Sequence, residues 1–335
     1  MADAPAPVPA PVSTSVLDVR NLDVRFRTRR GPVQAVDGVS FSLAPGEILG
    51  VVGESGCGKS TLCTSLVRLL PDNADVTGSI RFRGEELLEK TPAEMREIRG
   101  RHITMVLQNP MTAMDPLFTV GNQLDEVLRH NSSMTAEERG RRAMEMLRLV
   151  HIPSPVERLR SYPHQMSGGM KQRVLTAMAT ALKPGLLLAD EPTTALDVTI
   201  QEQILRLLAE IRATLGTAII LVTHDLGIVR RLTDRVVIMY AGRAVETGET
   251  EAIFTDPKHP YTRALLASIP RIGQTARRLT AIEGQIPDLA NLPPGCAFAP
   301  RCPSAMPDCT NAFPPSFDTG AGRTARCWLH DGRAA

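Results

Sequence analysis

The stretch Val51-Val52-Gly53-Glu54-Ser55-Gly56-Cys57-Gly58-Lys59-Ser60-Thr61 decides how this chain folds. It ends a short apolar run that begins at Ile48 and is typical of a buried parallel strand. From Lys59 onward, leucines recur at helical spacing as far as Leu70, and Pro71 ends the pattern. The sequence therefore predicts a strand, a glycine-rich turn and a helix in direct succession.

The turn carries the pattern G-x-x-x-x-G-K-S, which is typical of a P-loop that binds nucleotide phosphates. Its glycines let backbone N–H groups converge on an anion, and the helix adds the positive end of its dipole. We expect Lys59 to reach the β- and γ-phosphates and the Ser60 hydroxyl to ligate Mg²⁺. The nucleotide-binding residues expected here are Gly53, Glu54, Ser55, Gly56, Cys57, Gly58, Lys59, Ser60 and Thr61.

Polar residues follow three further apolar, strand-like runs: Gln108, Asp190 and His224. Strands that alternate with helices predict an α/β domain with a largely parallel sheet, where ligands bind at the carboxyl ends of the strands. Asp190 is then placed to hold Mg²⁺ opposite Ser60, and Glu191 to accept a proton from an attacking water. Gln108 would orient water or complete the metal shell, and His224 would contact the γ-phosphate or the water. A helix-capping acid pair, a polar strand end and a core histidine are the structural alternatives.

A second helix start with anion-binding character lies at Ser167-Gly168-Gly169. One nucleotide rarely needs two such sites in one chain. We therefore expect this segment to contact a nucleotide that is bound to another subunit.

Composition limits the class of protein. The chain has 335 residues and a formal net charge of +2, so no charge excess favours nucleic acid as a partner. No apolar run approaches the ~18 residues that a membrane span requires. Residues 1–14 are rich in Ala and Pro, which predicts a disordered leader rather than a signal peptide. Six cysteines without a secretion signal point to a reducing compartment.

Several motifs stand in a fixed order along the chain: Gly53 to Thr61, Gln108, Met166 to Gln172, Leu186 to Glu191, Thr194 to Asp197, and His224. They resemble the Walker A, Q-loop, signature, Walker B with catalytic glutamate, D-loop and H-loop of ABC transporter ATPases, and the resemblance covers about residues 16–250. It implies a P-loop NTPase of the ABC type: a RecA-like core, an antiparallel β subdomain and a helical subdomain at about 109–165.

The resemblance also assigns roles. ATP would lie between the Walker A of one subunit and Ser167, Gly168 and Gly169 of a second, with Asp197 nearby and a membrane permease docked on the helical subdomain. Glu191, His224, Gln108 and Lys59 would be catalytic. Phe26 matches the aromatic residue that stacks on adenine, although its side chain could equally belong to the core.

The chain from about residue 256 resembles the C-terminal extension of oligopeptide/dipeptide importer ATPases, which nickel and glutathione importers share. This likeness rests on His259-Pro260-Tyr261-Thr262 and on the tail from Ile282 to Cys327. It divides the chain into an ATPase domain at 15–255 and an extension at 256–335. Such systems use a pair of ATPase subunits, "D" and "F". The segment Ser167-Gly168-Gly169-Met170 resembles the "D" subunit more than the "F" subunit, whose signature keeps Gln where this chain has Met170.

Four cysteines cluster in the tail, with the spacing Cys296-x5-Cys302-x6-Cys309-x17-Cys327. Clustered thiols in a reducing compartment favour a metal over disulfides, and the spacing lacks the C-x2-C pairs usual in structural zinc sites. Four cysteines can hold a [4Fe–4S] cluster, which the resemblance implies here. Zinc and free thiols are the alternatives.

The sequence thus predicts an ATPase that drives import of di- or oligopeptides, with a nickel or glutathione importer as the alternative. The expected partners are an "F"-type ATPase in a head-to-tail heterodimer, two permease subunits and, indirectly, an extracytoplasmic binding protein. The expected location is the cytoplasmic face of the inner membrane. A soluble ABC ATPase acting on nucleic acid or ribosomes is a remote alternative, and Met170 leaves a weakly active regulatory subunit open.

Overall fold

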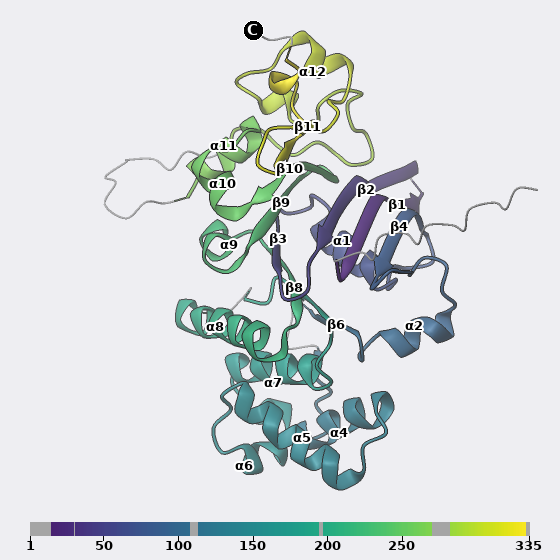
Figure 1. Ribbon diagram of the computed structural model, residues 1–335, viewed down its shortest axis with the longest axis vertical. Coiled ribbons are helices and arrows are strands. Elements are labelled where there is room, and N and C mark those ends of the chain that lie inside the picture. The colour runs from purple at the N-terminus through teal and green to yellow at the C-terminus, as the bar shows by residue number, and fades with distance from the viewer. Residues whose placement is uncertain (1–14, 30, 108–112, 194–196, 270–281, 333–335) are drawn as a thin grey trace, which may run out of the picture.

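The computed structural model describes residues 15–29, 31–107, 113–193, 197–269 and 282–332. Within them the chain forms two β-sheets, a helical unit at one end and an irregular C-terminal unit at the other (Figure 1). The predicted leader at 1–14 lies outside the described residues. No helix in the described ranges is long and apolar enough to cross a membrane.

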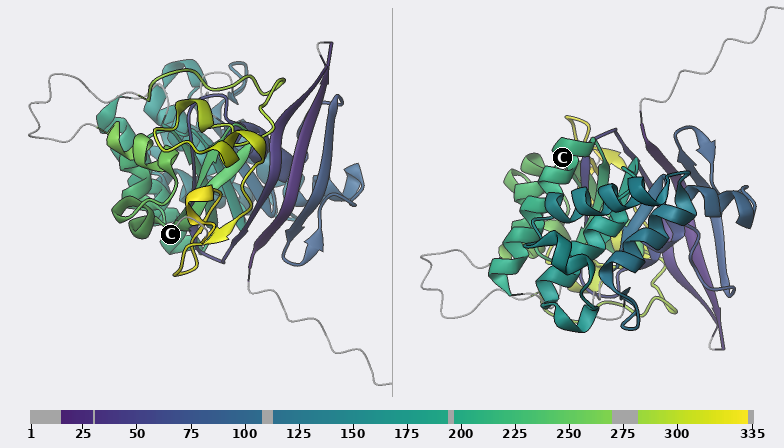
Figure 2. Two further views of the ribbon diagram at one scale, coloured as in Figure 1. Left: turned by 90° about the horizontal axis from the view of Figure 1, so that it is seen from above. Right: turned by 90° about the horizontal axis from the view of Figure 1, so that it is seen from below.

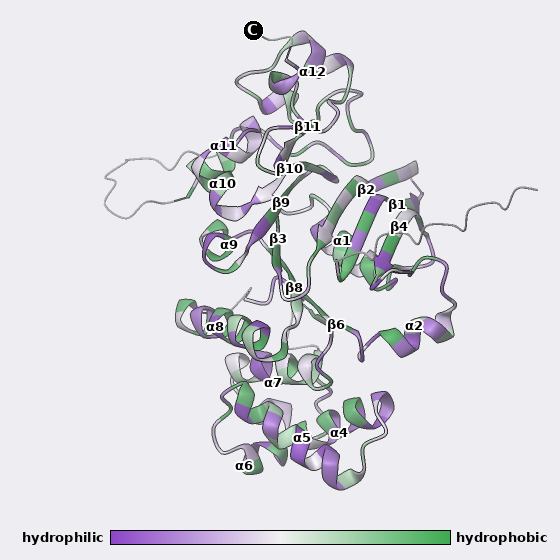
Figure 3. Ribbon diagram, viewed as in Figure 1, coloured by the Kyte–Doolittle hydropathy of each residue, from purple (hydrophilic) through white to green (hydrophobic). Residues whose placement is uncertain are grey.

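The larger sheet has the strand order β11-β12-β10-β9-β3-β8-β7-β6 and is parallel from β9 to β6. All residues of β3, β7 and β8 are buried, as expected for apolar strands covered on both faces. Figure 3 shows the hydrophobic colouring of these central strands. The strands are β3 (Ile48–Val52), β6 (Ile103–Val106), β7 (Leu186–Asp190), β8 (Ala218–Thr223), β9 (Arg235–Tyr240), β10 (Arg243–Glu249), β11 (Phe317–Asp318) and β12 (Thr324–Ala325).

The smaller sheet is antiparallel, with the order β2-β1-β4-β5, and stands as a separate layer beside the rest (Figure 2). Its long strands β1 and β2 pair from Leu17 opposite Leu43 to Thr28 opposite Gly31. Helix α1 (Lys59–Leu66) contacts β1, β2 and β7, so the P-loop helix lies between the two sheets. The strands are β1 (Leu17–Thr28), β2 (Gly31–Leu43), β4 (Ala74–Phe82) and β5 (Glu85–Glu86).

Helix α1 ends at Leu66, four residues before the position predicted from leucine spacing. Arg68 adopts a left-handed φ of 52°, and the Leu69 N–H donates to the Thr64 carbonyl at 3.0 Å. This is the hydrogen-bond pattern of a Schellman cap. The Arg68 guanidinium also donates to the Leu87 carbonyl at 3.0 Å, so a tertiary contact holds the end of the helix.

The helices between β6 and β7 share a core of their own, which includes Leu124, Leu147 and Val174. Helices α2 and α5 begin with capping boxes at Thr91 and Thr135, which satisfy backbone N–H groups at their first turns. The helices up to β8 are α2 (Pro92–Ile98), α4 (Val120–Asn131), α5 (Ala136–Leu149), α6 (Pro155–Leu159), η1 (Pro163–Gln165), α7 (Gly168–Thr180) and α8 (Val198–Leu215).

The C-terminal unit is attached to the larger sheet, an arrangement that the sequence did not predict. Strand β12 pairs antiparallel with β10 and extends the sheet. Tyr240, Tyr261 and Phe298 form a buried ring cluster with centroid distances between 4.6 and 5.4 Å. The helices after β8 are α9 (Leu226–Leu232), α10 (Thr250–Thr255), α11 (Pro260–Ala267), η2 (Ala299–Arg301), α12 (Pro307–Asn311) and η3 (Trp328–His330).

Packing of α1 between the sheets yields a stability prediction. Leu62 is fully buried in this core, whereas Leu69 is 57% exposed. We expect Leu62→Ala to lower the free energy of unfolding by about 2–5 kcal/mol, because it leaves a cavity. Leu69→Ala should cost about 0.5 kcal/mol or less. Urea unfolding followed by circular dichroism compares the two variants, and equal losses would contradict the assigned position of α1.

Candidate functional site

Two glycines determine the shape of the turn between β3 and α1. A Cβ atom at Gly53 would lie 2.2 Å from the Met239 carbonyl oxygen, and one at Gly58 would lie 2.2 Å from that of Ala35. Gly58 also has a φ of 99°, which favours glycine. The turn therefore passes close to β9 and β2, and only glycine fits at these two positions.

Lys59 lies buried inside this turn. Its ammonium group donates to the carbonyl oxygens of Gly53 at 2.8 Å and Glu54 at 2.9 Å. These bonds satisfy two of its three N–H donors and keep the positive charge at the start of α1. The arrangement suits an anion, because the ammonium and the helix N-terminus attract negative charge at the same place.

Ser60 and Asp190 meet across the gap between α1 and β7. The Ser60 hydroxyl donates to the Asp190 carboxylate at 3.2 Å, and Asp190 is only 5% exposed. Burial raises the pKa of Asp190, the Ser60 hydrogen bond opposes this rise, and the charge of Glu191 adds to it. Hydroxyl and carboxylate oxygens are ligands that Mg²⁺ prefers, so this pair fits the predicted metal position.

Glu191 turns from the end of β7 toward the end of β8. Its φ of 46° is left-handed, which is unusual for a non-glycine residue and typical of functional sites. Its backbone N–H donates to the Val222 carbonyl at 2.9 Å, and its carboxylate lies 3.4 Å from His224 Nδ1. The His224 side chain is 62% exposed, so the pair borders open solvent, where a water molecule can reach the carboxylate.

Some of the remaining predicted site residues lie in the described part of the chain, and others do not. Gln108, like the D-loop residues 194–196, lies outside the described residues. Asp197 caps α8 by accepting from the Ile200 N–H at 2.9 Å, and exposed Ser167 caps α7 by accepting from Met170 at 3.3 Å. Phe26 is half-buried and packs against the core between the sheets, so its side chain is partly used there.

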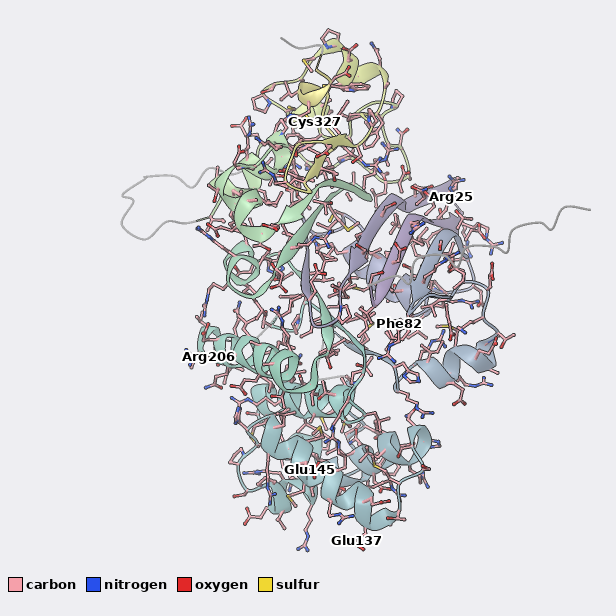
Figure 4. The ribbon with its side chains drawn as sticks, in the orientation of Figure 1. Arg25, Phe82, Glu137, Glu145, Arg206 and Cys327 are labelled. Atoms are coloured by element: carbon pink, nitrogen blue, oxygen red, sulfur yellow. The ribbon has the colours of Figure 1, made fainter. Side chains whose placement is uncertain are left out.

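The four tail cysteines line one small enclosed cavity of the C-terminal unit. Figure 4 labels Cys327 within this unit. Burial raises the pKa of Cys296, Cys302 and Cys327, the last to about 11, and the other thiols add to the effect on Cys327. All six cysteines of the chain are free. Across the described ranges, no group of three or more His, Cys, Asp or Glu side chains is arranged to hold a metal ion. The cysteines therefore converge without forming a preset metal site.

Comparison with known proteins identifies the family. Residues 36–194 match the family described as "ABC transporter", and residues 245–309 match "Oligopeptide/dipeptide transporter, C-terminal region". The dipeptide transport ATP-binding protein DppD of Bacillus subtilis (strain 168) is 50% identical over 321 residues, which cover 95% of this chain and 96% of that protein. This chain belongs to the ATP-binding proteins of ABC transporters.

Other members agree with this assignment. The oligopeptide transport ATP-binding protein AppD of the same organism is 43% identical, over 96% of this chain and 99% of that protein. The structure described as a dimeric post-hydrolysis state of the ATP-binding cassette MJ0796, bound to ADP and Pi, matches with a TM-score of 0.62 and 27% identity. The match covers 70% of this chain and 98% of that one.

Family membership confirms the predicted ABC-type α/β fold and the ATPase activity with Mg²⁺ and ATP. An ABC transporter ATPase acts together with membrane permease subunits. The sequence did not single out Arg301, whose guanidinium contacts the P-loop residue Glu54, and it noted Tyr261 only as part of a C-terminal motif. No local signal marks Arg301, because its partner lies 247 positions away.

The raised pKa of Asp190 yields a pH-dependent prediction. Since the folded-state pKa lies above the unfolded one, the ionised carboxylate destabilises the folded chain at a pH above both values. Asp190→Asn should therefore raise the urea midpoint of the nucleotide-free chain at about pH 8. The gain should disappear as the pH falls through the raised pKa, because the wild-type carboxyl then becomes neutral.

Asp197→Asn is the matched control, since Asn caps a helix about as well as Asp. It should leave the midpoint near the wild-type value at each pH. A lower midpoint for Asp190→Asn at alkaline pH would contradict the assigned cost of burying this carboxylate.

Proposed function

We propose that this chain is the ATPase subunit of an importer of di- or oligopeptides. The observation that carries the proposal is the match of residues 245–309 to a region described for oligopeptide/dipeptide transporters. DppD, AppD and OppD of Bacillus subtilis, which align over at least 94% of this chain, carry peptide transport in their names. We retain the division at about residue 256 and the location on the cytoplasmic face of the inner membrane as parts of this proposal.

The site residues perform a phosphoryl transfer to water. Lys59 leaves the turn carbonyls to hold the β- and γ-phosphates, while Ser60 and Asp190 hold the metal. When held by Ser60 and Asp190, Mg²⁺ would supply positive charge to the phosphate oxygens. Glu191 accepts the proton of the attacking water. His224, whose Nδ1 lies 3.4 Å from the Glu191 carboxylate, holds this carboxylate in position relative to the γ-phosphate.

A second subunit completes the site. Exposed Ser167, with Gly168 and Gly169, contacts the nucleotide of an "F"-type ATPase in a head-to-tail heterodimer. The dimeric form described for the similar MJ0796 cassette supports this assembly. Gln108, Asp197 and Phe26 keep their proposed roles at the metal, the subunit contact and the adenine ring. An extracytoplasmic binding protein delivers the substrate to the permease pair.

The four tail cysteines hold a [4Fe–4S] cluster in this proposal. The support is their convergence on one enclosed cavity. The residues present fit such a group in number and donor type.

Replacement of the general base tests the enzymatic part of the proposal. We expect Glu191→Gln to retain ATP binding and to lose about 10²-fold or more of the hydrolysis rate. The measurement is phosphate release by the complex with its partner ATPase and permease subunits, and uptake of a radiolabelled dipeptide in cells that carry the same variant. Near-normal phosphate release would exclude Glu191 as the base.

The same uptake assay tests the transported substrate. Cells that lack the chain should lose peptide uptake, and the wild-type chain should restore it. Restored uptake of nickel or glutathione instead of peptide would replace the peptide assignment with the alternative importer class.

Metal analysis tests the cluster. We expect the anaerobically purified chain to be brown and to contain iron and acid-labile sulfide. Cys302→Ser should lose both, whereas Cys63→Ala, which changes a buried thiol in α1, should keep them. Zinc without visible absorbance would reject the cluster, and absence of any metal would favour free thiols.

A further inference from the structure

Glu54, the first residue of the turn after Gly53, is held from three directions. Its backbone N–H donates to the Tyr261 hydroxyl at 3.0 Å, and its carbonyl accepts from Lys59 at 2.9 Å. Its carboxylate accepts two hydrogen bonds from the Arg301 guanidinium, at 2.8 and 3.1 Å. A parallel pair of this kind between arginine and carboxylate is strong and fixes orientation.

Two of the residues that contact Glu54, Tyr261 and Arg301, belong to the C-terminal extension. Tyr261 lies in α11 and Arg301 in η2, whereas Lys59 belongs to the ATP site itself. The Arg301 side chain is 4% exposed, and it also donates to the Tyr240 hydroxyl at 3.2 Å and the Glu283 carbonyl at 2.9 Å. Because these donors are satisfied inside packed surroundings, the guanidinium has little freedom to leave Glu54.

The contact balances charge beside the phosphate site. Glu54 places a carboxylate in a turn that must accept a triphosphate, and like charges at close range repel. Arg301 neutralises that carboxylate from the side of the C-terminal extension. When Lys59 turns to the phosphates, its bond to the Glu54 carbonyl is lost. Tyr261 and Arg301 then still hold this residue, together with the Cys57 N–H, which donates to the same carbonyl at 3.3 Å.

We propose that Arg301 and Tyr261 are positioning residues of the P-loop, through which the C-terminal extension keeps Glu54 neutralised and the turn in its phosphate-binding shape. The inference rests on ATP binding and is independent of the transported substrate and of any metal at the cysteines. A preformed turn lowers the cost of ordering on binding, so the effect falls on ATP affinity rather than on turnover.

Arg301→Gln in the full-length chain is the primary test, with Arg323→Gln as its matched control. Arg323 belongs to the same extension and is also mostly buried, but it binds Asp256 and the Ala252 carbonyl beside α10. We expect the Kd of a fluorescent N-methylanthraniloyl ATP to rise about tenfold in Arg301→Gln and less than about twofold in Arg323→Gln. In the assembled complex at saturating ATP, kcat of Arg301→Gln should stay within about twofold of wild type while KM rises.

Three further variants separate positioning from folding. Arg301→Lys should recover part of the affinity, because it restores the charge without the two-pronged geometry. Glu54→Gln combined with Arg301→Gln should bind the probe more tightly than Arg301→Gln alone, since the unpaired carboxylate is gone. Tyr261→Phe should weaken binding less than Arg301→Gln, because it removes a neutral hydrogen bond.

Several results would overturn the proposal. Equal weakening by Arg301→Gln and Arg323→Gln would mean that docking of the extension alone matters. A fall in kcat with unchanged Kd would place Arg301 outside P-loop positioning. If Arg301→Gln loses its folded circular dichroism spectrum, Arg301→Lys replaces it in the comparison. A wild-type Kd for both Arg301→Lys and Tyr261→Phe would then reject the positioning role.

Discussion

The close backbone approach at Gly53 and Gly58 is the constraint on which the rest of this structure depends. The turn passes close to the Met239 carbonyl on one side and the Ala35 carbonyl on the other, so it leaves no room for a Cβ atom between β9 and β2. Helix α1, which follows the turn, lies in the space between the two sheets, where Leu62 is fully buried. The position of the phosphate-binding turn is thus fixed by both sheets at once, and a side chain at either glycine would displace it.

The carboxyl edge of the larger sheet carries two groups that lower the stability of the fold. Asp190 is a carboxylate with a pKa raised by burial, and Glu191 beside it adopts a left-handed backbone conformation. Neither feature stabilises the fold, since buried charge and backbone strain both oppose it. They persist because four fully buried strand residues, 186–189, precede them in β7 and hold the edge in place. ATP binding and hydrolysis use the charge that folding alone would disfavour.

The C-terminal extension is part of the ATPase core in physical terms. Strand β12 adds to the larger sheet beside β10, and the rings of Tyr240, Tyr261 and Phe298 pack together across the junction. Through the same junction Arg301 reaches Glu54 in the phosphate-binding turn. Tyr261 and Arg301 both lie in the region that matches oligopeptide/dipeptide transporters. This region therefore contacts the phosphate-binding turn directly and can affect ATP binding.

The sequence by itself determined the strands and helices of the ATP site, because apolar runs, glycine turns and capping residues are local signals. It also predicted that Ser60, Asp190, Glu191 and His224 meet, since the carboxyl ends of parallel strands share one edge. Only the tertiary structure showed that α1 ends at Leu66, where Arg68 adopts a left-handed φ and its guanidinium contacts the Leu87 carbonyl. It likewise decided the two-residue pairing of β12 and the approach of Arg301 to Glu54 over 247 positions. Contacts between distant segments leave no periodicity in the chain, so they become visible only when the fold brings the partners together.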